Sequence, residues 1–165
     1  MAVSDHVLRQ LAERVGLHLL ASQRTVTTAE SCTGGWIAKA LTDVAGSSAW
    51  FGAGFVCYSN EAKQSMLGVS ARALRTDGAV SERVVTQLCR GALKASGASM
   101  AVAVSGIAGP SGGSKAKPVG TVWVAFAVKQ GSKIQVSAEV HRFTGGRDAI
   151  RRATTAAALR GLLRR

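Results

Sequence analysis

Residues 99–104, Ser-Met-Ala-Val-Ala-Val, form a short and nearly continuous apolar run. This pattern is typical of a strand that is covered on both faces, as in the sheets of α/β proteins. Along the rest of the chain, predicted strands alternate with amphipathic helices, which indicates helices on both faces of a sheet. Two successive strands, 121–128 and 133–142, are joined by a tight turn at 130–132 and must run antiparallel. We therefore predict an α/β protein, a three-layer α/β/α sandwich with a mixed β-sheet.

The other predicted elements follow from local signals on either side of that run. Apolar residues at helical spacing predict a helix from an N-cap at Ser4 to about Ser22, and a second helix from Ser81 to a cap near Gly97. No repeat, linker or second domain is evident, so residues 1–165 are expected to form a single domain. The remaining predicted elements are strands at 25–29 and 52–58, the latter buried, and helices at about 35–44, 60–66 and 146–163.

The composition excludes several classes of protein. The chain has 165 residues, 47% hydrophobic and 18% charged, which suits a domain with its own core and not a disordered segment. Three widely spaced cysteines, without a CxxC or HExxH motif, disfavour disulfides and metal, and no cofactor is expected. No signal peptide is visible, and the longest apolar stretch, about 119–128, is far short of the ~20 residues of a membrane helix. A soluble, cytoplasmic protein is expected.

The net charge of +12 is the unusual feature, with 21 lysines and arginines against 9 acidic residues. Seven of the arginines and one aspartate lie within 142–165, so this tail carries half of the excess. Such a charge raises nucleic acid as a partner. An RNA-binding surface would interleave aromatic residues, however, and the tail offers only Phe143. A solvated basic helix face that includes Arg160, Arg164 and Arg165 is therefore favoured over nucleic-acid binding.

Residues 28–35, TAESCTGG, place polar groups where a predicted strand passes into a helix. Ser31 would lie at the helix start, where free amides favour an oxyanion or a phosphate. The simpler interpretation is an N-cap whose hydroxyl accepts from one of those amides. Cys32 is a second candidate nucleophile, because a thiol at a helix start has a lowered pKa, although no histidine lies near it in the sequence.

Two further segments concentrate polar or glycine residues. In 58–63, YSNEAK, Lys63 follows Asn60 by about one helical turn. An exposed lysine is a surface cation, whereas a lysine that loses water has a lowered pKa and acts as a general base toward a serine. Residues 105–120 are rich in glycine and match neither a Walker loop nor GxGxxG. Such a loop is either a flexible surface segment or, through consecutive amides, an anion-binding nest.

Together these segments resemble the C-terminal domain family of CinA, the bacterial competence/damage-inducible protein, over nearly the whole chain. The matching blocks are TAESCTGG (28–35), GSS (46–48), YSNEAK (58–63), LGV (67–69), GAVS (78–81), SGIAGPSGG (105–113), KPVGTV (117–122) and the pattern Phe143, Arg147, Ile150-Arg151.

The resemblance implies an activity as well as a fold. Stand-alone members are nicotinamide-nucleotide amidases, which hydrolyse the carboxamide of nicotinamide mononucleotide to nicotinic acid mononucleotide and ammonia. It also implies a homo-oligomer, and the molybdopterin-binding-like domain that precedes this one in many relatives is expected to be absent. The alternative is a non-catalytic binding protein of the same fold, connected with competence or DNA damage.

The resemblance assigns roles to individual residues. The family's serine nucleophile falls on Ser31, its lysine base on Lys63, and a nearby tyrosine on Tyr58. Its substrate-binding arginine falls on Arg147, and Ser105 stands where threonine is usual. Substrate contacts are also expected from residues around these positions, with amides at 32–34 holding the oxyanion: Glu30, Cys32, Thr33, Gly34, Asn60, Gly106, Gly109 and Gly112.

Overall fold

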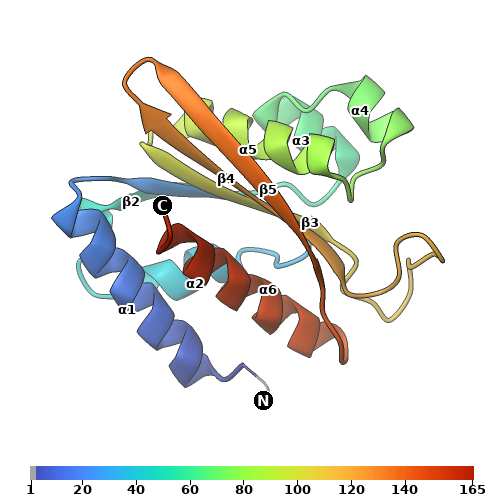
Figure 1. Ribbon diagram of the computed structural model, residues 1–165, viewed down its shortest axis with the longest axis horizontal. Coiled ribbons are helices and arrows are strands. Elements are labelled where there is room, and N and C mark those ends of the chain that lie inside the picture. Colours follow the sequence, from blue (N-terminus) through green and yellow to red (C-terminus); the bar gives the residue numbers. More distant parts are fainter. Residues whose placement is uncertain (1–2) are drawn as a thin grey trace.

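A computed structural model describes residues 3–165, which form five strands and six α-helices arranged in three layers (Figure 1). In chain order the elements are α1 (Asp5–Ala21), β1 (Val26–Glu30), α2 (Trp36–Thr42), the 3₁₀ turn η1 (Ser47–Ala49), β2 (Phe51–Val56), α3 (Asn60–Leu67), α4 (Ala71–Thr76), α5 (Glu82–Ser96), β3 (Met100–Gly106), β4 (Thr121–Gln130), β5 (Lys133–Arg142) and α6 (Arg147–Leu162).

The sheet order is β2-β1-β3-β4-β5. Strand β1 runs parallel to β2 and β3, whereas β4 runs antiparallel to β3 and β5. Helices α1, α2 and α6 lie on one face of the sheet, and α3, α4 and α5 lie on the other (Figure 1). The predicted three-layer sandwich with a mixed sheet is therefore confirmed. The parallel strands β1 and β2 both end at the same edge, where the chain passes into α2 and α3.

The two faces of the sheet carry side chains of different size, because successive strand residues point to opposite faces. The face toward α1, α2 and α6 is lined by large residues, and the face toward α5 by alanines. Small side chains let α5 lie close to the sheet, where it contacts all five strands. The central residues of the first face are Val102, Val104, Val124 and Phe126, and those of the second are Ala101, Ala103, Ala125 and Ala127.

The helix ends agree with the local signals. The Ser4 and Ser81 hydroxyls accept hydrogen bonds from amides in the first turns of α1 and α5, both at 3.3 Å, and Gly97 ends α5 with a positive φ. Helix α4 was not predicted, because its six residues are too few to show an apolar period. Among residues 3–165, no helix has both the length and the apolar character that crossing a membrane requires.

Strand β2 corrects one prediction. The segment 52–58 was expected to be a buried strand, but β2 ends at Val56 and its residues alternate between half-buried and exposed. It pairs only with β1, at the edge of the sheet. A short apolar run does not distinguish an edge strand from a central one, because that depends on strand order. The consequence is that Tyr58 lies beyond the strand, on the exposed side of the site described below.

Two of the three arginines assigned to a solvated face have protein partners. Arg164 Nη2 lies 3.3 Å from Glu139 Oε1. The Arg165 guanidinium lies 3.7 Å from the centre of the Phe126 ring and donates to Ser137 Oγ at 3.0 Å. These contacts join the residues at the end of α6 to β4 and β5. Arg160 and Arg164 are exposed, as expected of a solvated face, and Arg165 is the exception.

Gly91 lets α3 and α5 pack together, and its replacement by alanine is expected to destabilise the fold. A Cβ atom at Gly91 would lie 2.1 Å from the Leu67 carbonyl oxygen, which is backbone and cannot rotate away. We expect Gly91→Ala to lower the free energy of unfolding by about 1–3 kcal/mol, the usual cost of overpacking. Urea unfolding measures this. Gly52→Ala is the matched control, because nothing lies within 4 Å of its Cβ position. Equal stability of the two variants would contradict this account of the packing.

Candidate active site

Ser31 follows β1 directly, in the turn that leads to α2. The N-cap of α2 is Gly35, with φ +94°, and not Ser31. The buried carboxylate of Glu30 satisfies the start of the helix instead. It accepts hydrogen bonds from the Ile37 and Ala38 amides at 3.0 and 2.8 Å and from Thr33 Oγ1 at 2.7 Å. The N-cap interpretation of Ser31 was therefore wrong, and its hydroxyl is free for another partner.

That partner is Lys63, on the first turns of α3. The Lys63 side chain is 1% exposed. Its Nζ atom lies 3.2 Å from Ser31 Oγ and 3.0 Å from the carbonyl oxygens of both Cys57 and Tyr58. The Ser59 hydroxyl caps α3 by accepting a hydrogen bond from the Ala62 amide at 3.0 Å, so the helix begins at Asn60. This start places Lys63 in the first turns, with its amine directed toward the end of β1.

The surroundings of Lys63 favour a neutral amine. Burial lowers the pKa of Lys63 below its ordinary value, because removal from water disfavours the charged form. A neutral amine has two N–H bonds and one lone pair. The charged amine donates to Ser31 Oγ and to the Cys57 and Tyr58 carbonyls. In the neutral form, two N–H bonds suffice for the two carbonyls, and the lone pair is left to face the Ser31 hydroxyl.

Cys32 is not equivalent to Ser31 as a nucleophile. Its thiol is buried, and burial raises its pKa to about 12. The expectation of a lowered pKa at a helix start was therefore wrong, because loss of water is the largest influence on this thiol and the N-cap of α2 is Gly35, three residues further along the chain. Since the thiolate is the reactive form, Cys32 is a poor nucleophile near neutral pH.

A cavity of about 220 Å³ opens beside the Ser31–Lys63 pair. It lies at the edge where β1, β2 and β3 end, as ligand sites do in open α/β sheets. Apolar residues of the 78–81 loop and of the loop after β3 complete it. The sequence reasoning missed these because an apolar loop residue carries no chemical signal. The lining residues are Ser31, Cys32, Tyr58, Asn60, Lys63, Ala79, Val80, Ser105, Gly106, Ala108 and Arg147.

Arg147 crosses the cavity entrance from the start of α6. Its guanidinium donates to the Gly109 carbonyl at 2.8 Å and to Tyr58 Oη at 3.0 Å. It thereby connects the glycine-rich loop to the segment before α3. Ser105 lies at the floor, where its hydroxyl donates to the Ala79 carbonyl at 2.7 Å.

Five predicted site residues do not line the cavity. Glu30 and Thr33 are buried and hydrogen-bonded to each other, so substrate contact by either side chain is corrected to a structural role. Gly34 lies on the far side of the turn, and its amide donates to the Ser31 carbonyl at 3.0 Å, so it is not available for an oxyanion. Gly112 is exposed in the loop after β3, away from the lining. Gly109 is also outside the lining, but its carbonyl accepts a hydrogen bond from Arg147 and so helps to hold that side chain at the cavity.

A buried lysine amine on a serine hydroxyl, at the carboxyl edge of a parallel strand pair, has the geometry of the serine–lysine hydrolases. Among residues 3–165, histidine, cysteine and carboxylate side chains form no cluster of three that could hold a metal ion.

The CinA C-terminal domain model matches residues 8–165, and the chain therefore belongs to that family. It is 58% identical over 160 residues to the nicotinamide-nucleotide amidohydrolase PncC of Escherichia coli, covering 97% of this chain and 95% of that protein. It is 57% identical over 153 residues to the protein of the same name from Pseudomonas putida, covering 93% of each. The crystal structure of the competence/damage inducible protein CihA from Agrobacterium tumefaciens superposes with a TM-score of 0.92 at 46% identity, covering 100% of this chain and 99% of that one.

Proposed function

We propose that this protein hydrolyses the carboxamide of nicotinamide mononucleotide to nicotinic acid mononucleotide and ammonia. The names of its relatives from E. coli and P. putida support an amidohydrolase that acts on a nicotinamide nucleotide. The observation that carries the proposal is the buried Lys63 amine, 3.2 Å from Ser31 Oγ, at the wall of a cavity with Arg147 at its entrance. An amide hydrolase needs an activated nucleophile of this kind.

In the proposed reaction, Lys63 takes the proton of the Ser31 hydroxyl as Oγ attacks the carboxamide carbon. The developing oxyanion requires backbone donors. The Ser31 and Gly34 amides already donate to protein carbonyls, and Thr33 is buried outside the lining, so we assign this role to the amide of Cys32, which lines the cavity. The C–N bond then breaks, and ammonia leaves with the proton that Lys63 took, passed to it directly or through Tyr58, which Lys63 reprotonates. Water, deprotonated by Lys63, releases the carboxylic acid from the Ser31 ester and restores the hydroxyl.

Arg147 is proposed to bind the phosphate of the nucleotide. It is a cation at the cavity entrance, held by Gly109 and Tyr58 in a fixed direction. An arginine suits this task because its planar donors match phosphate oxygens. The net charge of +12 also favours the approach of an anionic substrate.

The substitution Arg147→Ala is expected to raise KM for nicotinamide mononucleotide about 10- to 100-fold, with a smaller effect on kcat. This corresponds to the loss of about 1.5–3 kcal/mol from a charged hydrogen bond. Steady-state kinetics with the mononucleotide and with nicotinamide riboside, which lacks the phosphate, measures the effect. Arg142→Ala, an exposed arginine outside the cavity lining, is the matched control. Equal losses on both substrates would show that Arg147 does not bind the phosphate.

The proposed function is tested by incubating the purified protein with nicotinamide mononucleotide and measuring ammonia and nicotinic acid mononucleotide together. Equal amounts of the two products are expected. Asparagine and glutamine, whose carboxamides carry no nucleotide, serve as controls for specificity. Absence of turnover, combined with oligonucleotide binding that falls steeply with salt, would replace the proposal by that of a non-catalytic binding protein.

A further inference from the structure

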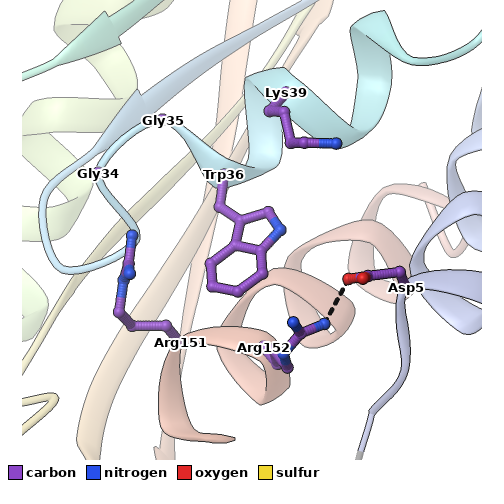
Figure 2. A pocket seen from close by; sticks show the side chains of 7 residues that line it. All are labelled: Asp5, Gly34, Gly35, Trp36, Lys39, Arg151 and Arg152. Atoms are coloured by element: carbon purple, nitrogen blue, oxygen red, sulfur yellow. Dashed lines mark hydrogen bonds and ion pairs between the residues drawn. The ribbon is translucent and has the colours of Figure 1, made fainter. Parts of the chain in front are cut away.

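Arg151, on α6, donates two hydrogen bonds to the turn that contains Ser31. Its Nε atom donates to the Cys32 carbonyl at 3.1 Å, and its Nη2 atom donates to the Thr33 carbonyl at 2.7 Å. These are the first two carbonyls after Ser31 in the chain. Figure 2 shows the Arg151 guanidinium extended from α6 toward the loop that contains Gly34.

The contacts around Arg151 hold it in place. Its guanidinium lies 5.0 Å from the centre of the Trp36 ring. Arg152 lies 4.7 Å from the same ring and pairs with Asp148 at 2.7 Å and with Asp5 (Figure 2). Both arginines therefore lie against Trp36, but Arg152 directs its donors to carboxylates whereas Arg151 directs them to backbone carbonyls. Two hydrogen bonds from one planar guanidinium fix the orientation of the two accepting carbonyls as well as their distance from Arg151.

Gly34 lies beside this contact. A Cβ atom at Gly34 would lie 3.4 Å from Arg151 Nη2, an ordinary contact distance, but the residue has φ +61°, which side-chain-bearing residues rarely adopt. The backbone conformation of the turn, and not the space beside Arg151, therefore favours glycine at this position. A separate pocket of about 400 Å³ lies here and shares no lining residue with the cavity beside Ser31 (Figure 2). It is lined by Asp5, Gly34, Gly35, Trp36, Lys39, Arg151 and Arg152.

We propose that Arg151 is a positioning residue for the reaction. Each peptide unit is planar, so fixing the Cys32 and Thr33 carbonyls also fixes the Thr33 and Gly34 amides at the opposite edges of those planes. The Gly34 amide donates to the Ser31 carbonyl, which belongs to the same planar peptide unit as the Cys32 amide that we assign to the oxyanion. The positive charge of Arg151 also polarises both peptide units, which strengthens their amides as donors. This inference rests on the proposed function.

The kinetic consequence follows from where the interaction acts. An oxyanion forms only after attack, so misaligned amides slow the chemical step and leave substrate binding almost unchanged. We expect Arg151→Ala to lower kcat about 10- to 100-fold, less than the 10²–10³ typical for deleting an oxyanion donor, and to change KM less than about threefold. The kcat of Arg151→Lys should lie between those of wild type and Arg151→Ala, because one ammonium does not reproduce the two hydrogen bonds of the planar guanidinium.

The experiment measures kcat, KM and thermal unfolding for wild type, Arg151→Ala, Arg151→Lys and the control Arg152→Ala. Arg152 contacts the same tryptophan and bridges two carboxylates, but it touches neither the turn nor the cavity. Its variant should therefore lose stability and keep kcat within about twofold. Guanidinium ion at millimolar concentration should restore part of the kcat of Arg151→Ala and leave Arg152→Ala unchanged.

The result that overturns the inference is a normal kcat in folded Arg151→Ala, or a kcat loss that Arg152→Ala shares and that guanidinium does not reverse. Either outcome would reduce Arg151 to a structural contact. If wild type itself does not hydrolyse nicotinamide mononucleotide, the proposed function fails first, and the two failures are distinguishable.

Discussion

Replacement of Ser31 by alanine is expected to lower kcat for carboxamide hydrolysis by about 10⁴-fold or more, because the variant has no oxygen with which to attack the substrate. The neighbouring Cys32 does not substitute for it, since its thiol is buried and its pKa is raised to about 12. The loss of this one hydroxyl should leave the fold intact. Ser31 is only partly buried, and the turn is held by Glu30 and Arg151.

Rates of ammonia release under single-turnover and steady-state conditions measure this effect. Ser65→Ala is the matched control, because Ser65 is an exposed serine on the same helix as Lys63 and lies outside the cavity lining. It should retain wild-type kcat. Near-normal turnover by folded Ser31→Ala would refute the serine–lysine mechanism, while leaving the identity of the substrate untouched.

Replacement of Lys63 by methionine is expected to lower kcat about 10²- to 10⁴-fold, the range for loss of a positioned general base. Methionine retains most of the volume of the buried side chain, so the result reports the amine and not a cavity. A lysine-to-arginine variant is a second test, because arginine remains protonated and should be as inactive as methionine.

The pH dependence gives an independent test of the same residue. Burial lowers the pKa of Lys63, and only the neutral amine accepts a proton from Ser31. In wild type, kcat/KM should therefore rise about tenfold per pH unit below that lowered pKa and level off above it. This rise of kcat/KM with pH should be absent from the profile of Lys63→Met. A profile that is the same in both proteins would show that Lys63 is not the base.

Stability should follow the same titration. The folded protein holds Lys63 with a lower pKa than the unfolded chain does, so the unfolded chain binds more protons between the two values. Stability contributed by this group therefore rises with pH across that interval. Compared with Lys63→Met, wild type should gain stability as pH rises from the folded pKa of Lys63 toward its ordinary value near 10.5.

Much of the fold was predictable because its signals are local. Serines 4 and 81 cap helices, Gly97 ends one, and the apolar run 99–104 forms the central strand β3. These are preferences of a residue and its near neighbours, and tertiary packing did not override them. The exceptions, α4 and the edge position of β2, arise where a segment is too short for periodicity or where its environment depends on strand order.

The candidate site was predictable only as a set of residue types. The sequence by itself determined that a serine, a cysteine and a lysine follow strands, and the family resemblance singled out Ser31 and Lys63. The sequence did not determine that Lys63 Nζ lies 3.2 Å from Ser31 Oγ. The two residues are 32 positions apart, and only the fold of α3 over the edge of the sheet brings them together. Nor did it show that Glu30 caps α2 or that Arg151 holds the Cys32 carbonyl.

The tertiary structure alone decided which of these groups are reactive. Burial lowers the pKa of Lys63 and raises that of Cys32, although both residues follow strands and both lie near the same turn. The physical reason is that loss of water favours the neutral form of every ionisable group, which makes an amine a base and a thiol inert. Solvent exposure is a property of packing between distant segments, so residue order specifies the chemical groups and the folded chain assigns their protonation.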